Sequence, residues 1–373
     1  MRALVFRSGP IQRALAGLLG GEAPRPWWRG HPGLALREVP EVELPGGWVR
    51  VAVDRAAVTR SDLDLILHRA AAPPVPSGRP GVVPGAEILG NVVEVHPSVT
   101  SVAPGDRVVV DPTLSCRERG FPDAPCDACR AGWPWACGRA GERGRTRIGA
   151  RPLGPGRRLG AHPELPGGWA PRILAHHGQL LGVPAGWSSR VALLTLAVAR
   201  VLPAVEWLLA AGSEGAVPRG TRVLGDPAEA RVAALLAGLP AAEPEPGEAR
   251  HLLLTSPGPG DWAAVRAAAA PGARVAVVGG GWEPRPGSGV EVRSFAGYGH
   301  RPWRSSDANG RGGGEGGLRD LDRARALVGR IAGGLQDVLT HVYPVRQFRR
   351  ALATAEGRGG SEAGRVALAP DDS

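Results

Sequence analysis

The stretch PGDRVVV (Pro104–Val110) is followed, five residues later, by a loop that contains all the cysteines of the chain. Proline and glycine precede the apolar run, a pattern that predicts a short strand. The cysteines are spaced C-x9-C-x2-C-x7-C and are Cys116, Cys126, Cys129 and Cys137. Four thiolates on one loop suit a tetrahedral zinc ion, and four protein ligands leave no position open for a substrate. The spacing therefore predicts a loop braced by one structural zinc, with four unmetallated thiols as the alternative.

The composition narrows the class of protein. The chain has 373 residues and 43% of them are hydrophobic, which is enough for two domains with cores of their own. All 45 basic residues are arginine and the formal net charge is +10. These arginines are scattered and form no basic helix, so we expect no nucleic-acid partner.

No membrane or targeting segment is expected either. The most apolar window, Val191–Gly212, contains Arg200, Pro203 and Glu206, so it falls short of a membrane span and reads as a packed helix. The apolar run near the N-terminus is interrupted by arginines and lacks a convincing cleavage site. We therefore expect a cytoplasmic protein.

The hydrophobic pattern changes near residue 190. The first half is β-rich, with strands expected at Ala3–Phe6, Trp48–Val53, Leu89–Val95 and Arg107–Val110. The second half alternates Ala/Leu-rich helices with short apolar runs, at Thr221–Leu224, His251–Leu254 and Arg274–Val278. Such runs are typical of buried parallel strands. A helix at Leu321–Ile331 and a strand at Arg365–Leu368 are expected to follow, so the fold class is α/β.

Several stretches together resemble the zinc-containing medium-chain alcohol dehydrogenases. They are PGDRVVV ahead of the cysteine loop, GGWAPRILAH at Gly167–His176 and THVYPVRQFRRAL at Thr340–Leu352. The cysteine spacing differs from the usual C-x2-C-x2-C-x7-C of that family only in its first gap. We identify the chain as a divergent member of this superfamily.

The resemblance implies a fold and a chemistry. It implies a GroES-like β-barrel domain at residues 1–188 with its structural zinc loop at 116–137. A shortened, degenerate Rossmann-type parallel-sheet domain follows at 189–310, and a segment at 311–373 returns to the first domain. It further implies a catalytic zinc between the domains that polarises an alcohol while hydride passes to NAD(P). A homodimer or homotetramer is expected by family, and the cleft between the domains is a place for a small molecule.

The first ligand of that catalytic zinc is replaced in this sequence. The family places a cysteine ahead of a Ser/Thr-Asp pair, and the matching stretch here is Thr59-Arg60-Ser61-Asp62. A threonine hydroxyl does not ionise near neutral pH and is a poor zinc ligand. Ser61 matches the hydroxyl that passes the substrate proton, and Asp62 matches the carboxylate that orients the ligand histidine.

The other two ligands are replaced as well. Ala86 stands where the family has the histidine of a Gly-His-Glu motif, although Glu87 is kept. Leu194 stands at the third ligand position. Glu87 alone does not hold zinc against water. The nearest substitute donors in sequence are Asp64, His68, His176 and His177, of which the two adjacent histidines are expected to face solvent.

The turn that binds dinucleotide in the family is also altered. Only the first glycine of G-x-G-x-x-G is present, as Gly225, and Pro227 takes the second position. Asp226 and Glu229 place negative charge where a pyrophosphate binds, although Asp226 is a good N-cap for a helix at Ala228–Ala237. The twelve residues Leu239–Arg250 are too few for the family's strand–helix–strand segment, and Glu243 or Glu245 lies about where a ribose-binding acid is expected.

Two functional hypotheses follow. The first is a protein of alcohol dehydrogenase type that keeps a structural zinc, lacks the catalytic zinc and is not an active alcohol dehydrogenase, with NAD(P) binding in doubt. The alternative is a zinc-independent NAD(P)H-dependent oxidoreductase that acts on a small carbonyl, quinone or enone.

Overall fold

The computed structural model describes residues 1–7, 9, 33–67, 81–210, 221–238, 247–256, 261–279, 290–295, 320–357 and 364–371. The chain divides into two compact units. The first contains Met1–Leu193 and Thr340–Ser373, and the second contains Leu194–His300 and Leu318–Leu339. Within the described residues, no helix is long and apolar enough to cross a membrane.

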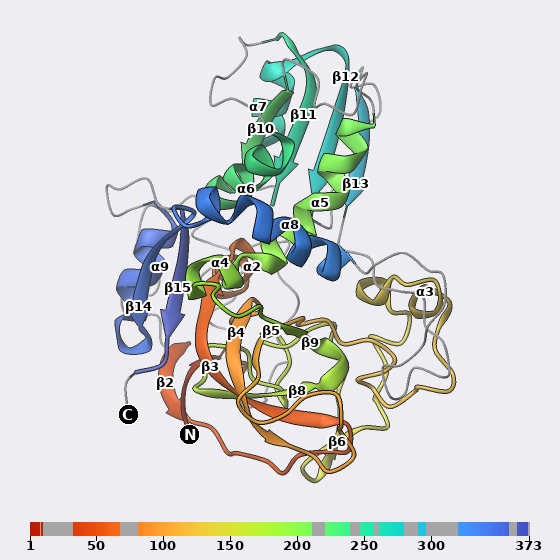
Figure 1. The fold of residues 1–373 in the computed structure, drawn as a ribbon, viewed down its shortest axis with the longest axis vertical. Coiled ribbons are helices and arrows are strands. Elements are labelled where there is room, and N and C mark those ends of the chain that lie inside the picture. The colour runs from red at the N-terminus through yellow and green to blue at the C-terminus, as the bar shows by residue number, and fades with distance from the viewer. Residues whose placement is uncertain are drawn as a thin grey trace. The chain divides into compact units, whose positions relative to one another are not determined.

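The first unit is built around a large, mainly antiparallel sheet (Figure 1). Its strands run in the order β14-β15-β3-β4-β5-β9, and β8 also pairs with β3. Their bounds are β3 Trp48–Val58, β4 Ile88–Val95, β5 Arg107–Val110, β8 Arg172–His176, β9 Leu180–Gly182, β14 Leu339–Pro344 and β15 Arg365–Ala369. Two-stranded sheets are formed by β1 (Arg2–Phe6) with β2 (Leu34–Glu38) and by β6 (Arg147–Ile148) with β7 (Arg151–Pro152).

The strand β3 is central to this unit because it pairs with three neighbours, β4, β8 and β15. Apolar side chains from these strands form one continuous core with β1 and β2. The pairing of β15 with β3 places the last described strand in the sheet of the first unit. Short helices connect the strands, namely α2 Arg60–Ile66, α3 Asp127–Arg130, α4 Ser189–Leu193 and α9 Phe348–Ala355.

The second unit contains a parallel sheet of four described strands in the order β10-β11-β12-β13. The strands are β10 Thr221–Gly225, β11 Ala249–Thr255, β12 Ala269–Val278 and β13 Glu291–Phe295. Helices α5 (Thr195–Leu209), α6 (Pro227–Ala237), α7 (Asp261–Ala268) and α8 (Asp320–Leu335) accompany them. This arrangement confirms the predicted α/β class with a parallel sheet in the second part of the chain.

Several expected boundaries differ from the structure: β3 continues to Val58, five residues beyond the predicted Val53, and α8 continues to Leu335 instead of Ile331. Strand β12 begins five residues before the predicted Arg274, because Ala269 pairs with Ala249 ahead of an irregularity in the β11–β12 ladder. The helix α8 packs against α5 and α6 and so lies in the second unit, although the sequence analysis placed residues 311–373 in the returning segment. Its buried face, Leu321, Ala324 and Val328, follows helical spacing, which explains this packing.

Candidate functional site: a cysteine cluster and two altered ligand sites

The four cysteines converge in the first unit. Their sulfur atoms all lie within 4.8 Å of one another. The Sγ atoms of Cys116 and Cys137 are 3.7 Å apart, and those of Cys126 and Cys137 are 4.0 Å apart. Zn–S bonds of about 2.3 Å in a tetrahedron place the sulfurs about 3.8 Å apart, so this spacing fits a zinc ion. All four are free thiols without disulfide bonds.

Local structure and hydrogen bonds hold these sulfurs in place. Helix α3 begins directly after Cys126, and a short 3₁₀ helix at Pro134–Ala136 ends at Cys137. The backbone N–H of Cys126 donates to Cys116 Sγ, and that of Gly138 donates to Cys126 Sγ, both at 3.3 Å. A hydrogen bond from the Cys129 thiol lowers the pKa of Cys137 to about 5, whereas burial raises the pKa of Cys116 to about 11. Binding of a cation would release the remaining protons.

A buried arginine that the sequence analysis missed supports the loop. Arg119 lies between the first two cysteines in sequence and its side chain is completely buried. Its Nη1 donates to the carbonyl oxygens of Glu142 at 3.0 Å and Gly154 at 3.1 Å, so it joins distant parts of the loop. Burial lowers the pKa of Arg119, and the charges of Cys137 and Cys116 oppose that shift. Its position beside a cluster of thiolates was not visible from the sequence.

Thr59 and Asp62 form a closed polar pair at the start of α2. Thr59 is the N-cap of this helix, and its backbone N–H donates to Asp62 Oδ2 at 3.0 Å. Its hydroxyl donates to the same oxygen at 2.6 Å. The other carboxylate oxygen, Asp62 Oδ1, accepts from the backbone N–H of Gly85 at 3.1 Å. Both oxygens of Asp62 are therefore bonded to this chain's own groups.

Ser61 lies beside this pair and contacts a second arginine that the sequence analysis missed. Its Oγ is 2.9 Å from Thr59 Oγ1 and accepts a hydrogen bond from Arg158 Nη1 at 2.8 Å. Arg158 is 97 residues away in sequence, so no local pattern indicated the contact. The guanidinium group places positive charge next to the hydroxyl that the resemblance linked to proton transfer.

The segment around Ala86 packs as part of the core. Gly85 has a φ of +93°, and a Cβ there would lie 2.5 Å from Trp169 Cδ1, so this position requires glycine for packing alone. Ala86 is buried and carries no donor atom for a metal. Glu87 Oε2 lies 3.7 Å from Nη2 of Arg365 on β15, and the two side chains are only 4% and 2% exposed. Glu87 thus forms an ion pair with the returning segment.

The substitute donors suggested by the sequence do not assemble into a further cluster. His176 and His177 were expected to face solvent, and this expectation is wrong: both are half-buried, and His176 packs edge-to-face on Trp48 with ring centroids 5.9 Å apart. Burial lowers the pKa of both histidines. Asp64 accepts a hydrogen bond from Arg60, and His68 lies outside the described residues. Across the described ranges, only the four cysteines bring three or more metal-binding side chains together.

Leu194, at the third expected ligand position, belongs to the second unit. It occupies the N-cap position of α5 and its side chain is fully buried. An apolar side chain supplies no metal ligand.

The turn after β10 begins α6 as predicted, and the chain's own carboxylates occupy its start. Asp226 is the N-cap, and its side chain accepts from the backbone N–H of Glu229 at 2.9 Å. Glu229 is 1% exposed, contacts Arg200 Nη2 at 2.9 Å and accepts from the hydroxyl of Ser256 at 2.7 Å. One of the N–H groups that would otherwise bind a phosphate is therefore already bonded.

Gly225 also has a role in packing. Its φ is +101°, and a Cβ at this position would lie 1.9 Å from the carbonyl oxygen of Thr255 on the adjacent strand. The glycine is therefore required by the close approach of β10 and β11, whether or not a nucleotide binds. Glu243 and Glu245, proposed for the ribose, lie outside the described residues.

Parts of the chain are similar in sequence to known dehydrogenases. Residues 45–185 match the family model of the alcohol dehydrogenase GroES-like domain. D-altritol 5-dehydrogenase of Agrobacterium fabrum is 35% identical over 102 residues, which are 27% of this chain and 27% of that enzyme. The aligned segment thus spans about a quarter of that relative.

Solved structures extend the similarity over the whole chain. A thermostable alcohol dehydrogenase from Pyrobaculum aerophilum covers 99% of each chain at 21% identity, with a TM-score of 0.64. Galactitol-1-phosphate dehydrogenase from Escherichia coli covers 99% of this chain and 100% of its own at 17% identity, with a TM-score of 0.61. At these identities the similarity shows the fold, a GroES-like domain with a Rossmann-like parallel-sheet domain.

Proposed function

We propose a function for this chain, whose residues 45–185 match the family model of the alcohol dehydrogenase GroES-like domain. It is an alcohol dehydrogenase-like protein that keeps a structural zinc and has lost the metal site for alcohol oxidation. The observation that carries this proposal is the closed pair of Thr59 and Asp62. The carboxylate that the family uses to orient a ligand histidine is bonded here to Thr59 and Gly85.

The structural zinc rests on the four converging cysteines. Their sulfur spacing fits a tetrahedral ion, and their backbone N–H···S hydrogen bonds would stabilise thiolates. Such a zinc has all four positions filled by protein, so it braces the loop between Cys116 and Cys137 and takes no part in a reaction. Arg119 offsets part of the negative charge of the bound cluster and ties the loop to the rest of the unit.

The loss of the catalytic metal follows from the donor atoms. A catalytic zinc needs three protein ligands and one open position, where it acts as a Lewis acid on the substrate oxygen. The three family positions here hold a neutral hydroxyl, a methyl group and a leucine, at Thr59, Ala86 and Leu194. Glu87, the remaining acid, lies 3.7 Å from Arg365 and is a single carboxylate. This donor set does not fit the metal.

The start of α6 in the second unit is poorly suited to binding a dinucleotide. The pyrophosphate of a dinucleotide needs free N–H groups at the helix N-terminus and a site without negative charge. At α6, Asp226 caps the helix and Glu229 lies buried beside it. Glu229 is paired with Arg200, but the Asp226 carboxylate at the start of the helix would repel a pyrophosphate, so we infer that NAD(P) affinity is lost together with the metal site.

One observation favours the alternative of a zinc-independent NAD(P)H oxidoreductase. The hydrogen bond from Arg158 to Ser61 stabilises the serine oxygen as it gives up a proton. In that alternative, NAD(P)H would supply hydride when bound, and Ser61, or Tyr298 outside the described residues, would supply the proton to the carbonyl, quinone or enone. The altered turn at α6 argues against it, because the hydride donor must bind first.

The metal content tests the proposal directly. We expect about one zinc per chain, measured by plasma mass spectrometry after gel filtration, because only the cysteine cluster supplies a complete ligand set. We also expect no alcohol-dependent formation of NADH with short-chain alcohols and polyols. Two zinc ions per chain, or turnover that a chelator abolishes, would contradict the loss of the catalytic site.

A titration with NADH and NADPH separates the two candidate functions. We expect no saturable change in nucleotide fluorescence up to about 1 mM, a concentration that corresponds to about −4 kcal/mol of binding. The matched variant Asp226→Ser keeps a good N-cap and removes one negative charge. If charge repulsion is the cause, this variant binds more tightly than the natural chain. Micromolar binding by the natural chain would instead support the NAD(P)H-dependent alternative.

A further inference from the structure

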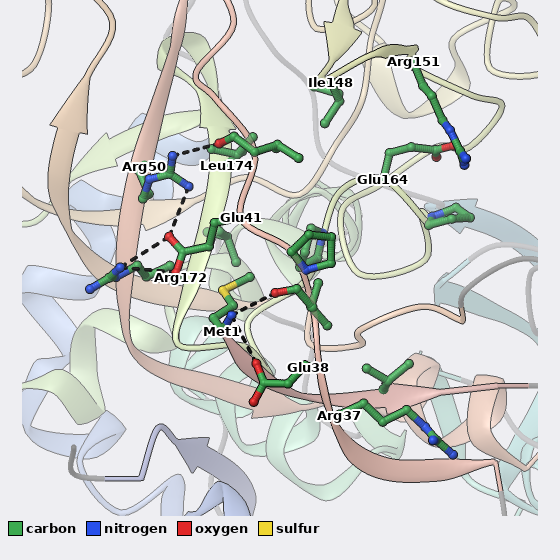
Figure 2. Close-up of a pocket in the computed structure, with 18 of the residues that line it drawn as sticks. Met1, Arg37, Glu38, Glu41, Arg50, Ile148, Arg151, Glu164, Arg172 and Leu174 are labelled. Carbon is green, nitrogen blue, oxygen red and sulfur yellow. Dashed lines mark hydrogen bonds and ion pairs between the residues drawn. The ribbon is translucent and has the colours of Figure 1, made fainter.

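The first unit contains a cavity of about 400 Å³ that is separate from the cysteine cluster and from the Thr59–Asp62 pair. It lies between the ends of β1 and β2, the β6–β7 hairpin, and β8 (Figure 2). Its volume is in the range of small-molecule sites in proteins. We propose that this cavity binds an organic monocarboxylate with an apolar body, such as a medium-chain fatty acid.

The inner wall of the cavity is apolar. Ile148, Ile173 and Leu174 line it and are almost fully buried in the core of the unit. Val39 and Val42 add partly buried side chains. Water against such a wall has few hydrogen-bond partners, so an apolar group that displaces it gains about 25 cal/mol for each Å² buried. The wall therefore selects a ligand with a hydrocarbon part.

The carboxylates at the cavity already have partners. Glu41 lies 3.7 Å from Arg50 Nη1 and 3.3 Å from Arg172 Nη1, and Figure 2 shows it between these two arginines. Glu38 lies 3.5 Å from the amino group of Met1. Glu164 lies 2.9 Å from His162 Nδ1. Glu38 and Glu41 are thus paired with cations, whereas the ring nitrogen near Glu164 already accepts a hydrogen bond from the backbone N–H of Glu164.

Three more arginines line the cavity, namely Arg7, Arg37 and Arg151. Within the described part of the chain, none of the three forms an ion pair, so the cavity carries excess positive charge. The buried Nε of Arg37 also has no hydrogen-bond partner among the described groups. A buried donor without a partner is destabilising, and a carboxylate is the acceptor that a guanidinium group binds best. Surplus guanidinium groups beside an apolar wall are complementary to a carboxylate on a hydrocarbon chain.

Calorimetric titration of the full chain with octanoate and with 1-octanol tests this site. Octanoate is expected to bind with a Kd of about 0.1–1 mM, as a ligand of this size allows. Octanol has the same hydrocarbon chain without the charge, and we expect it to bind at least tenfold more weakly. Equal binding of the two probes, or no saturation by octanoate below about 10 mM, would overturn the proposal.

Substitutions of cavity-lining residues test whether octanoate binds in this cavity. Arg37→Gln and Arg151→Gln are each expected to weaken octanoate binding about five- to tenfold, because each removes a cation from the wall. Val39→Phe is expected to abolish binding by filling the cavity. Arg2→Gln is the matched control: Arg2 is an exposed arginine on β1 that does not line the cavity, so the octanoate affinity of this variant should equal that of the natural chain.

Each variant is compared by thermal melting before titration. If Arg37→Gln melts at a lower temperature, the exposed Arg151 still supplies an independent measurement. Unchanged octanoate affinity in Arg151→Gln and Val39→Phe would overturn the assignment. The site involves neither the zinc cluster nor the turn at α6, so its failure and the failure of the proposed function are separate results.

Discussion

Replacing Cys129 with serine is expected to lower the zinc content from about one ion per chain to near zero. A neutral hydroxyl does not replace a thiolate in a tetrahedral site, and the metal contributes to folding because it binds the folded loop. A ligand present at about a thousand times its Kd stabilises the folded state by about 4 kcal/mol. Loss of that term is expected to lower the melting temperature of the first unit by about 8–16 °C, measured by calorimetry.

Two comparisons make this result specific. Asp127→Asn changes an exposed side chain of the same loop, 97% exposed, and should leave both zinc content and melting temperature unchanged. Incubation of the natural chain with a strong chelator should reproduce the loss of stability without any substitution. A Cys129→Ser protein that retains one zinc, or melts at the same temperature as the natural chain, would show that the cysteines do not form a metal site.

Replacing Arg365 with methionine is expected to destabilise the first unit by about 3–5 kcal/mol. Arg365 and Glu87 are both nearly fully buried, and their side chains are 3.7 Å apart at the closest atoms. Removal of the guanidinium leaves the Glu87 carboxylate in the core without its charge partner, which costs more than the ion pair itself contributes. The measurement is the free energy of unfolding from urea denaturation followed by circular dichroism.

A double-mutant cycle tests whether the buried Glu87 carboxylate causes the loss of stability in Arg365→Met. Adding Glu87→Gln to the Arg365→Met variant removes the isolated charge, so the double variant should be more stable than Arg365→Met alone. Arg346→Met is the control, since Arg346 is 60% exposed and its ion pair with Asp371 lies at the surface. That variant should lose less than about 1 kcal/mol. Equal losses at Arg346 and Arg365 would contradict a buried, interdependent pair.

The sequence correctly predicted those helix and strand positions that depend only on adjacent residues. Asp226 ahead of Pro227 predicted the start of α6, and the structure places the N-cap at that residue. The run at residues 107–110 predicted β5 with its correct bounds. These predictions succeeded because capping, strand alternation and proline placement depend on a few adjacent residues. The end of β12 was predicted and its beginning was not, since the extra pairing of Ala269 with Ala249 depends on the neighbouring strand.

The sequence also determined which donor atoms exist. It places four thiols at metal-binding spacing, and it places a threonine, an alanine and a leucine where the family has zinc ligands. Those identities hold in any conformation, so the proposal of one metal site in place of two rests on the sequence.

Tertiary structure alone decided what the remaining polar groups do. The bond from Asp62 to Gly85, the contact of Arg158 with Ser61 and the pairing of Arg365 with Glu87 join residues 23, 97 and 278 positions apart. The burial of His176 against Trp48 and the arginine-lined cavity arise in the same way, from strands that meet only in the folded unit. Local patterns carry no information about such pairs, because the distance between two side chains is set by the packing of the sheet and not by their separation along the chain.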